Sequence, residues 1–281
     1  MKIRNHTFTS PPSGGSGGGL AKPPTYIAMC SGVECASLAA LVRGWRPLCF
    51  SETDPFPASV LKYRYPDVPN PGDTTRVDWG RYRGKCDLVV AGPPCQAFSA
   101  AGKRKSLADP RNNPTLAFAA AVDAIDPKYI VWENVPGVLS LRDNAFGCLL
   151  ARLAGIGRPL EPGPRPGRGR SSLHWAWDRK AAAHRPKWAD AGSVAGPGRS
   201  LAWRILDARF FGVPRRRRRV FVVAGRAGDR PDPAEMLLVF EGLCGDSAAG
   251  GEAREKAAAA VARLAGAAGA GKTARRKRQT A

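Results

Sequence analysis

The sequence contains no run of about 18 uninterrupted apolar residues, and its amino terminus lacks the short apolar stretch of a signal peptide. These absences predict a soluble protein without a membrane partner. The seven cysteines form no Cys-x-x-Cys pair and have no cluster of histidines near them. Such a distribution argues against a disulfide scaffold and against a zinc site, so we expect no bound metal and a location in the reducing cytoplasm.

Acidic residues are scarce relative to basic ones. The chain has 23 Asp and Glu against 44 Lys and Arg, which gives a formal net charge of +21 at pH 7. A charge of this size attracts polyanions, so nucleic acid is the expected partner. A compositional explanation of the positive charge stays open, because biased codon usage also produces chains this rich in Arg, Ala, Gly and Pro.

Composition divides the chain into three parts. Residues 1–24 are rich in Gly, Ser and Pro and predict a disordered leader. Residues 25–246 have the pattern of one folded domain, interrupted over 157–198 by an irregular basic insertion. Residues 247–281 form a low-complexity basic Ala/Gly tail. Within it, Gly266–Thr273 has P-loop spacing, but an Ala-rich helical pattern stands where a strand is required, so we reject an NTPase function.

Strand and helix patterns alternate through the first half of the chain. The expected strands are Tyr26–Cys30, Pro47–Glu52, Cys86–Ala91, Tyr129–Trp132 and Val220–Ala224, with Leu237–Phe240 as a candidate last strand. The expected helices are Glu34–Val42, Pro55–Tyr65, Leu116–Ile125 and Ala202–Phe211. Alternating strands and helices predict an α/β fold with a doubly wound, largely parallel sheet.

The most distinctive stretch is Gly92–Gln96, which reads Gly-Pro-Pro-Cys-Gln. It follows an apolar strand, and its two prolines fix the backbone and remove two donors, so Cys95 cannot continue the sheet. The carboxyl ends of the strands form the ligand crevice of an open α/β sheet, which makes Cys95 a candidate nucleophile. The alternative is a buried cysteine that acts as a small hydrophobe. Glu133 ends a later strand and is expected at the same edge.

Other features predict a nucleotide-like cofactor. Ser31 and Gly32 form a tight turn between a strand and a helix, which is a plausible cradle for a cofactor. Glu52 ends the second strand, 20 residues after Gly32, where doubly wound folds bind ribose hydroxyls. Asp73 follows a turn and either faces the cofactor or caps a loop.

Together, these motifs resemble those of the C5-cytosine DNA methyltransferase family, in the branch often seen in phages and prophages. The resemblance runs from about Tyr26 to Asp246 and includes Glu133-Asn134-Val135. The residues that match the family's cofactor-binding positions are Ser31, Gly32, Glu52, Asp73, Pro94 and Leu116. The residues that match its catalytic positions are Cys95, Glu133, Arg217 and Arg219.

The resemblance implies a Rossmann-like fold that uses S-adenosylmethionine and binds double-stranded DNA. It also implies covalent catalysis, in which Cys95 attacks C6 of a cytosine flipped out of the duplex and protonated Glu133 binds the N3 edge of the ring. S-adenosylmethionine then donates its methyl group to C5. Arg219 is expected to contact the flipped base, and Arg217 a nearby phosphate or the same pocket.

The chain departs from the family pattern in two ways. Arg215 stands where the family's Gln-x-Arg-x-Arg element has glutamine. After Asp246 we find no match to the family's target-recognition region, its next motif or its Asn-containing helix, which predicts a C-terminally incomplete fold. Two other interpretations stay open: an inactive DNA-binding remnant, or one half of a split enzyme completed by a second polypeptide. Methylation of RNA is disfavoured, because the Ser31-Gly32 turn differs from that of the family's RNA enzymes.

Overall fold

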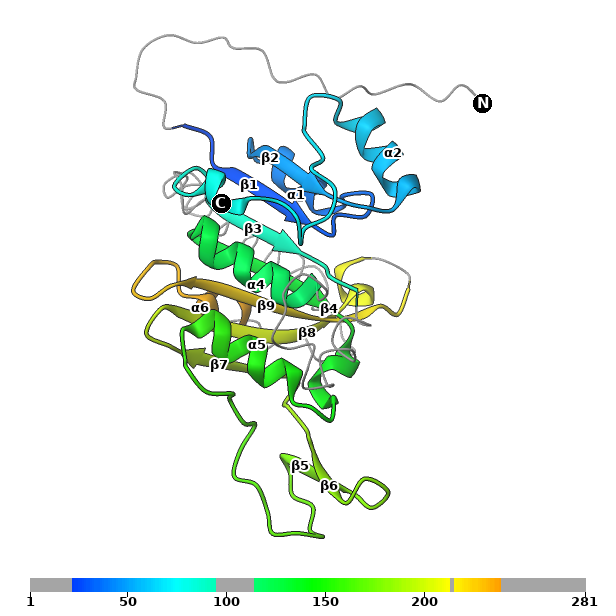
Figure 1. The fold of residues 1–281 in the computed structure, drawn as a ribbon, viewed down its shortest axis with the longest axis vertical. Helices are drawn as coiled ribbons and strands as arrows, with labels where there is room; N and C mark the ends of the chain where they lie inside the picture. Colours follow the sequence, from blue (N-terminus) through cyan, green and yellow to red (C-terminus); the bar gives the residue numbers. More distant parts are fainter. Residues whose placement is uncertain (1–21, 95–113, 213–214, 239–281) are drawn as a thin grey trace, which may run out of the picture.

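A computed structural model describes residues 22–94, 114–212 and 215–238. Its centre is a seven-stranded sheet with the order β2-β1-β3-β4-β9-β8-β7 (Figure 1). The strands are β1 (Thr25–Met29), β2 (Arg46–Ser51), β3 (Leu88–Ala91), β4 (Tyr129–Asn134), β7 (Ala191–Ala195), β8 (Arg199–Asp207) and β9 (Arg218–Arg226). A separate two-stranded sheet pairs β5 (Trp175–Asp178) with β6 (Ala183–Pro186).

The sheet has a parallel half and an antiparallel half. Strands β2, β1, β3 and β4 pair in parallel, whereas β9 runs antiparallel to β4 and continues through β8 into β7. The order 2-1-3-4 places a topological switch point between β1 and β3, which confirms the predicted doubly wound α/β class. The carboxyl ends of the four parallel strands therefore lie along one side of the sheet, here called the carboxyl edge.

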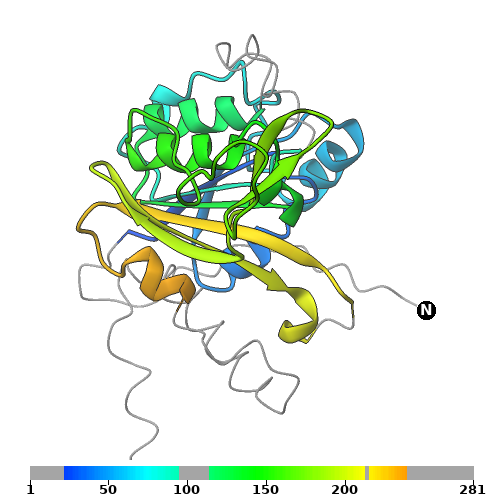
Figure 2. The same cartoon turned by 90° about the horizontal axis from the view of Figure 1, so that it is seen from below.

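Helices cover both faces of the sheet, as Figure 2 shows. The helical elements are α1 (Ala36–Leu41), α2 (Pro55–Arg64), α4 (Pro114–Ile125), α5 (Ala145–Ala154) and α6 (Pro233–Leu238), with the shorter turns η1 (Trp79–Tyr82), η3 (Pro136–Ser140) and η4 (Ala208–Phe211). Phe118 of α4 and Phe146 of α5 pack on one face with Ile27 of β1. Leu61 of α2 and Met236 of α6 pack on the other face. One apolar layer therefore packs on each face of the sheet and holds the helices against it.

The start of α2 illustrates how local sequence sets an element. Asp54 caps the helix by accepting a hydrogen bond from the Phe56 N–H at 3.0 Å, and Pro55 occupies the first helical position. Proline is tolerated there because its missing N–H has no intrahelical partner in that turn. This cap and this helix were predicted from the sequence and are confirmed.

Three sequence predictions are wrong. The segment Ala202–Phe211 was expected to be a helix but forms most of β8 and then η4. Leu237 belongs to α6 and not to a last strand, while Phe240 lies outside the described residues. The insertion 157–198 is more regular than expected, because it contains the β5–β6 pair and the edge strand β7. Its residues 157–174 carry no helix or strand.

The reason for the β8 error lies in its position. The strand pairs with β7 on one side and β9 on the other, and the sheet is covered on both faces at this point. Leu201 and Trp203 therefore pack into one apolar layer while Ala202 packs into the other. A strand buried on both faces loses the apolar and polar alternation that would distinguish it from a buried helix.

None of the helices in the described part of the chain has both the length and the apolar character that a membrane span requires.

Candidate cofactor pocket and arginine–glutamate site

A pocket of about 270 Å³ opens at the carboxyl edge beside β1, β2 and β3. Four residues predicted to bind a cofactor line it: Gly32, Glu52, Asp73 and Pro94. The sequence analysis did not assign a cofactor-binding role to the other lining residues, which are Cys30, Ser51, Thr53, Gly72, Thr74, Thr75, Gly92 and Pro114. The pocket thus lies at the switch point between β1 and β3, where doubly wound folds bind ligands.

Glu52 links the end of β2 to the turn after β1. Its Oε2 accepts a hydrogen bond from the Gly32 N–H at 2.7 Å. Its Oε1 accepts from the N–H groups of Thr53 and Asp54, both at 2.8 Å. A carboxylate oxygen has two lone pairs, so Oε1 is saturated and Oε2 can accept one further hydrogen bond, for example from a hydroxyl. Glu52 is therefore positioned rigidly at the pocket wall.

The loop that carries Asp73 is held against β2. The Asn70 side chain accepts from the Glu52 and Gly72 N–H groups and donates to the Glu52 carbonyl, each at 3.0 Å. The Ser51 hydroxyl donates to the Gly72 carbonyl at 2.6 Å. Asp73 then accepts from the Thr75 N–H at 2.9 Å. These contacts place a second carboxylate on the pocket wall.

Two predicted cofactor residues do not line the pocket. The Ser31 hydroxyl donates to the Ala28 carbonyl at 2.9 Å, and the Ser31 N–H donates to the Ser51 carbonyl at 3.2 Å. Ser31 therefore ties the turn to the ends of β1 and β2. Leu116 lies in the first turn of α4 and is partly buried.

A buried acid lies beneath the same turn. Glu34 is 3% exposed and has a left-handed backbone with φ of 60°. Its Oε1 accepts from the Ser37 N–H at 3.0 Å and the Ser37 hydroxyl at 3.1 Å, and that hydroxyl lies 2.5 Å from the Tyr26 hydroxyl. Burial raises the pKa of Glu34 to about 7, although the Ser37 hydrogen bonds oppose the rise. Burial likewise raises the pKa of the Cys30 thiol to about 11, with Glu52 nearby adding to the effect.

The second part of the site joins β4 to β9. The Arg219 Nε lies 3.0 Å from Glu133 Oε1, and the Arg217 Nη2 lies 3.7 Å from the same oxygen. The Arg219 side chain is 24% exposed and that of Arg217 is 55% exposed, so the shorter contact is also the better shielded from water. The structure thus brings together three of the four predicted catalytic residues.

The fourth, Cys95, lies outside the described residues, but the first part of its loop is described. A Cβ atom added to Gly92 would be 3.7 Å from Glu133 Oε2, so the carboxylate lies beside the loop's first residue. The Asn134 side chain is 3% exposed and donates to the Pro93 carbonyl at 2.9 Å. Its Oδ1 accepts from the Val135 N–H at 2.9 Å. Asn134 therefore fixes the start of the thiol loop to the end of β4.

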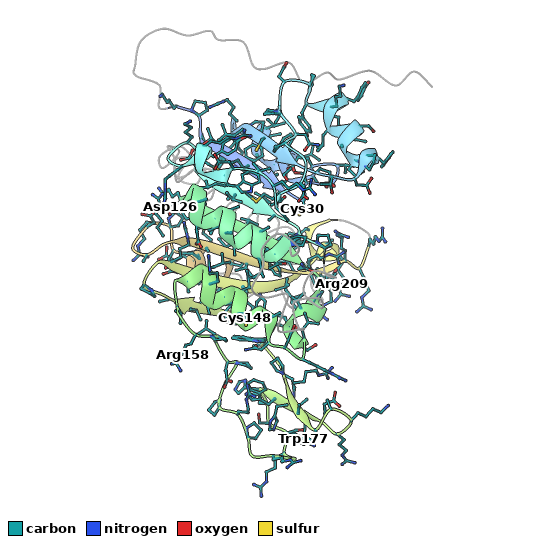
Figure 3. All side chains as sticks on the ribbon, in the orientation of Figure 1. Cys30, Asp126, Cys148, Arg158, Trp177 and Arg209 are labelled. Atoms are coloured by element: carbon teal, nitrogen blue, oxygen red, sulfur yellow. The ribbon has the colours of Figure 1, made fainter. Side chains whose placement is uncertain are left out.

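The arginine element has its own anchor at the end of β8. Asp207 accepts hydrogen bonds from the Arg217 N–H at 3.1 Å and the Arg209 N–H at 3.3 Å. In Figure 3, Arg209 and Cys30 lie toward the same side of the sheet, and Asp126, which precedes β4, lies at the opposite end. The sequence did not single out Asp207 or Asn134 for these roles. The sequence contained a signal for Asn134, because it belongs to the recognised Glu-Asn-Val motif. It contained none for Asp207, which fell in a segment expected to be helical.

Comparison with known proteins gives three kinds of match. Residues 25–157 match the family model described as C-5 cytosine-specific DNA methylase. The chain is 49% identical over 249 residues to the DNA N-6-adenine-methyltransferase of Escherichia phage P1, a match that covers 84% of this chain and 33% of that protein. It is 29% identical over 210 residues to the Type II methyltransferase M.AquIA of Picosynechococcus, a match that covers 72% of each.

Among solved structures, the S. pombe Dnmt2 methyltransferase aligns with a TM-score of 0.49 and 18% identity, over 72% of this chain and 51% of that one. The chain spans about one third of the length of the phage P1 relative. The family model covers the cofactor pocket, the start of the thiol loop and Glu133. Over residues 25–157, which include Glu52, Asp73 and Glu133, the chain thus carries a C-5 cytosine-specific DNA methylase domain.

Proposed function

We propose that this chain methylates C5 of cytosine in double-stranded DNA, with S-adenosylmethionine as the methyl donor and Cys95 as the nucleophile. The observation that carries the proposal is the position of Glu133. Its carboxylate lies beside Gly92 at the start of the thiol loop and 3.0 Å from Arg219. An acid and a cation thus converge next to the segment that leads to the thiol.

The chemistry explains why these groups are needed together. C5 of cytosine is a poor nucleophile because the ring is electron-poor. Addition of the Cys95 thiolate to C6 forms an S–C6 bond and pushes electron density to C5, while a protonated Glu133 hydrogen-bonds N3. After the methyl group reaches C5, loss of the C5 proton breaks the S–C6 bond and frees Cys95. Arg219, whose Nε lies 3.0 Å from Glu133 Oε1, can hold Glu133 in place or contact the base.

The pocket at β1–β3 fits the donor. Glu52 Oε2 retains an acceptor position for a ribose hydroxyl, and Asp73 presents a second acceptor for an amino group. A Cβ atom on Gly32 would meet nothing within 4 Å, so a ligand can approach this backbone closely. S-adenosylmethionine, when bound there, supplies an activated methyl group. Glu52 and Asp73 would hold it at the carboxyl edge.

A second candidate function is methylation of an adenine amino group, which is favoured by the name of the phage P1 relative. That match covers one third of the relative, and the name does not assign the adenine activity to that third. Loops of amino-methylating enzymes resemble Asp-Pro-Pro-Tyr, whereas this chain has Gly-Pro-Pro-Cys over Gly92–Cys95. A thiol in that place suits covalent addition to C6 and has no role in stacking on an amino-bearing base.

The test is covalent trapping on duplex DNA that contains 5-fluorocytosine, because fluorine at C5 blocks release of the thiol. We expect an adduct that depends on S-adenosylmethionine and survives denaturing electrophoresis. Cys95→Ala should abolish it, while Cys148→Ala, which removes a partly buried thiol on α5, should leave it intact. A folded wild-type protein that forms no adduct would refute cytosine C5 chemistry. Formation of N6-methyladenine on unmodified DNA would favour the second candidate.

A further inference from the structure

Residues 157–188 leave the sheet and project beyond its β7 end, as Figure 1 shows. This segment, here called the basic arm, contains the β5–β6 ribbon and has eight Lys and Arg but only two acidic residues, a net charge of +6. All eight basic side chains are exposed. The arm thus concentrates positive charge on a part of the chain that contributes to neither the pocket nor the arginine–glutamate site.

Both acidic residues of the arm are already neutralised. Glu161 pairs with Arg165 at 2.6 Å within the arm. Asp178 pairs at 2.6 Å with Arg142, which lies outside the arm on the segment after η3. The one carboxylate of the ribbon, Asp178, is therefore already engaged by an arginine from outside the arm.

The arm has a small core that holds the ribbon in shape. Trp175 is 1% exposed, and its indole N–H donates to the Gly163 carbonyl at 2.9 Å. The Arg165 guanidinium lies 4.2 Å from the centre of the Trp175 ring. On the neighbouring strand, the His184 ring packs edge-to-face on Trp177 at 4.9 Å. Aromatic contacts of this kind give the ribbon a fixed surface that it presents without a large ordering cost.

The base of the arm is attached to the element that follows the catalytic glutamate. Chain residues Glu133 and Asn134 end β4 and lead directly into η3. The Trp188 N–H donates to the Leu139 carbonyl of η3 at 3.1 Å, and the Arg142–Asp178 pair adds a second link. The base of the arm is therefore tied to the segment that directly follows Glu133 in the chain.

We propose that the basic arm is a duplex-binding element that contacts the DNA backbone next to the target base. The choice of DNA rests on the proposed function. A two-stranded ribbon fits the major groove, which is about 12 Å wide, and the turn between β5 and β6 carries Arg179 and Lys180. With Arg185 on β6, these residues supply the phosphate contacts that give affinity without reading sequence.

The experiment measures how binding depends on salt. Fluorescence anisotropy with a labelled DNA duplex, from about 50 to 200 mM salt, gives the slope of log K against log salt, to which each phosphate contact contributes about 0.9. The arm variant is Arg179→Ala/Lys180→Ala/Arg185→Ala. The control Arg46→Ala/Lys62→Ala/Arg64→Ala removes the same charge from exposed positions at the start of β2 and the end of α2, away from the carboxyl edge.

We expect the arm variant to bind about tenfold more weakly or worse and to lose about two to three from the magnitude of the slope, while the control keeps both values near those of the wild type. Equal losses in both variants would overturn the proposal, because the effect would then come from net charge alone. A loss seen with duplex RNA but not with duplex DNA would overturn the choice of DNA.

The 5-fluorocytosine adduct separates this proposal from the proposed function. Wild-type protein that forms the adduct, together with an arm variant whose slope is unchanged, overturns the arm and leaves the cytosine chemistry standing. A wild-type protein without adduct, together with an arm variant that loses its slope, supports the arm and ends the cytosine chemistry. Circular dichroism of each variant confirms that the fold is retained.

Discussion

Glu34 should make the stability of the fold depend on pH between about 4.5 and 7. Its pKa rises from an ordinary value of 4.5 to about 7 because burial penalises the charged form. Below pH 4.5 the carboxyl is protonated in both the folded and the unfolded chain, and no cost arises. Between the two pKa values only the unfolded chain releases the proton, so the free energy of unfolding falls as the pH rises. Above about pH 7 Glu34 is ionised in the folded chain too, and the free energy of unfolding falls no further on its account.

The size of the loss follows from the same values. One pKa unit corresponds to about 1.4 kcal/mol, so ionised Glu34 costs roughly 3 kcal/mol at pH 8. Glu34→Gln keeps an oxygen that accepts from the Ser37 N–H and hydroxyl, but it has no charge to bury. We expect the variant to match the wild type at pH 4.5 and to be more stable by about that amount at pH 8.

The assay is urea unfolding of both proteins at several pH values, and the informative quantity is the difference between them, in which other titrating groups cancel. Ser37→Ala provides a second check. The Ser37 hydroxyl lowers the Glu34 pKa, so its removal should extend the falling part of the wild-type curve to higher pH. A stability difference between Glu34→Gln and the wild type that stays constant from pH 4.5 to 8 would refute the reasoning.

Three other predictions follow from the contacts described above. Asn134→Ala should destabilise the fold by about 1–3 kcal/mol in urea unfolding and slow adduct formation, because the buried Pro93 carbonyl loses its donor; an unchanged unfolding midpoint would contradict this. Gly196→Ala should lower the free energy of unfolding by about 1–3 kcal/mol, since the added Cβ would be 2.3 Å from a backbone carbonyl oxygen of α5. Gly157→Ala, whose Cβ would meet nothing within 4 Å, should leave the free energy of unfolding unchanged in the same urea measurement. Glu52→Gln should weaken S-adenosylmethionine binding about 10- to 100-fold in calorimetry, because charged hydrogen bonds contribute about 1.5–3 kcal/mol each; undiminished affinity would place the cofactor elsewhere.

The sequence predicts the parallel half of the fold well because each of its strands is followed by a clear stop. Asp54-Pro55 starts a helix, and Gly92 ends β3. It does not predict β8, which is buried on both faces and reads like a helix. The basic insertion gave no periodic pattern, yet its ribbon forms around one buried tryptophan, Trp175. Contacts with distant segments, and not local propensity, decide those parts.

In the site, the acidic residues could be predicted from the sequence, but the residues that hold them in place could not. Glu52, Asp73 and Glu133 could be chosen from the sequence because each acid follows a strand or turn. The groups that hold them could not, because hydrogen bonds such as the one from Asn134 to Pro93 join residues 41 positions apart. The role of Cys95 remains a prediction, since it lies outside the described residues.

The pairing of β4 with β9 bears on how this site tolerates insertions and deletions. Glu133 stands opposite Phe221, and Arg219 lies two residues earlier, so both charged side chains project from one face. If β9 were shifted by one residue along β4, Arg218 would take the place of Arg219 near Glu133. An arginine would still face the glutamate, so charge alone does not fix the register of the two strands. Val222 and Val223, buried on opposite faces, would then be exchanged between the two apolar layers. Hydrophobic packing, and not charge, thus selects which arginine meets the glutamate.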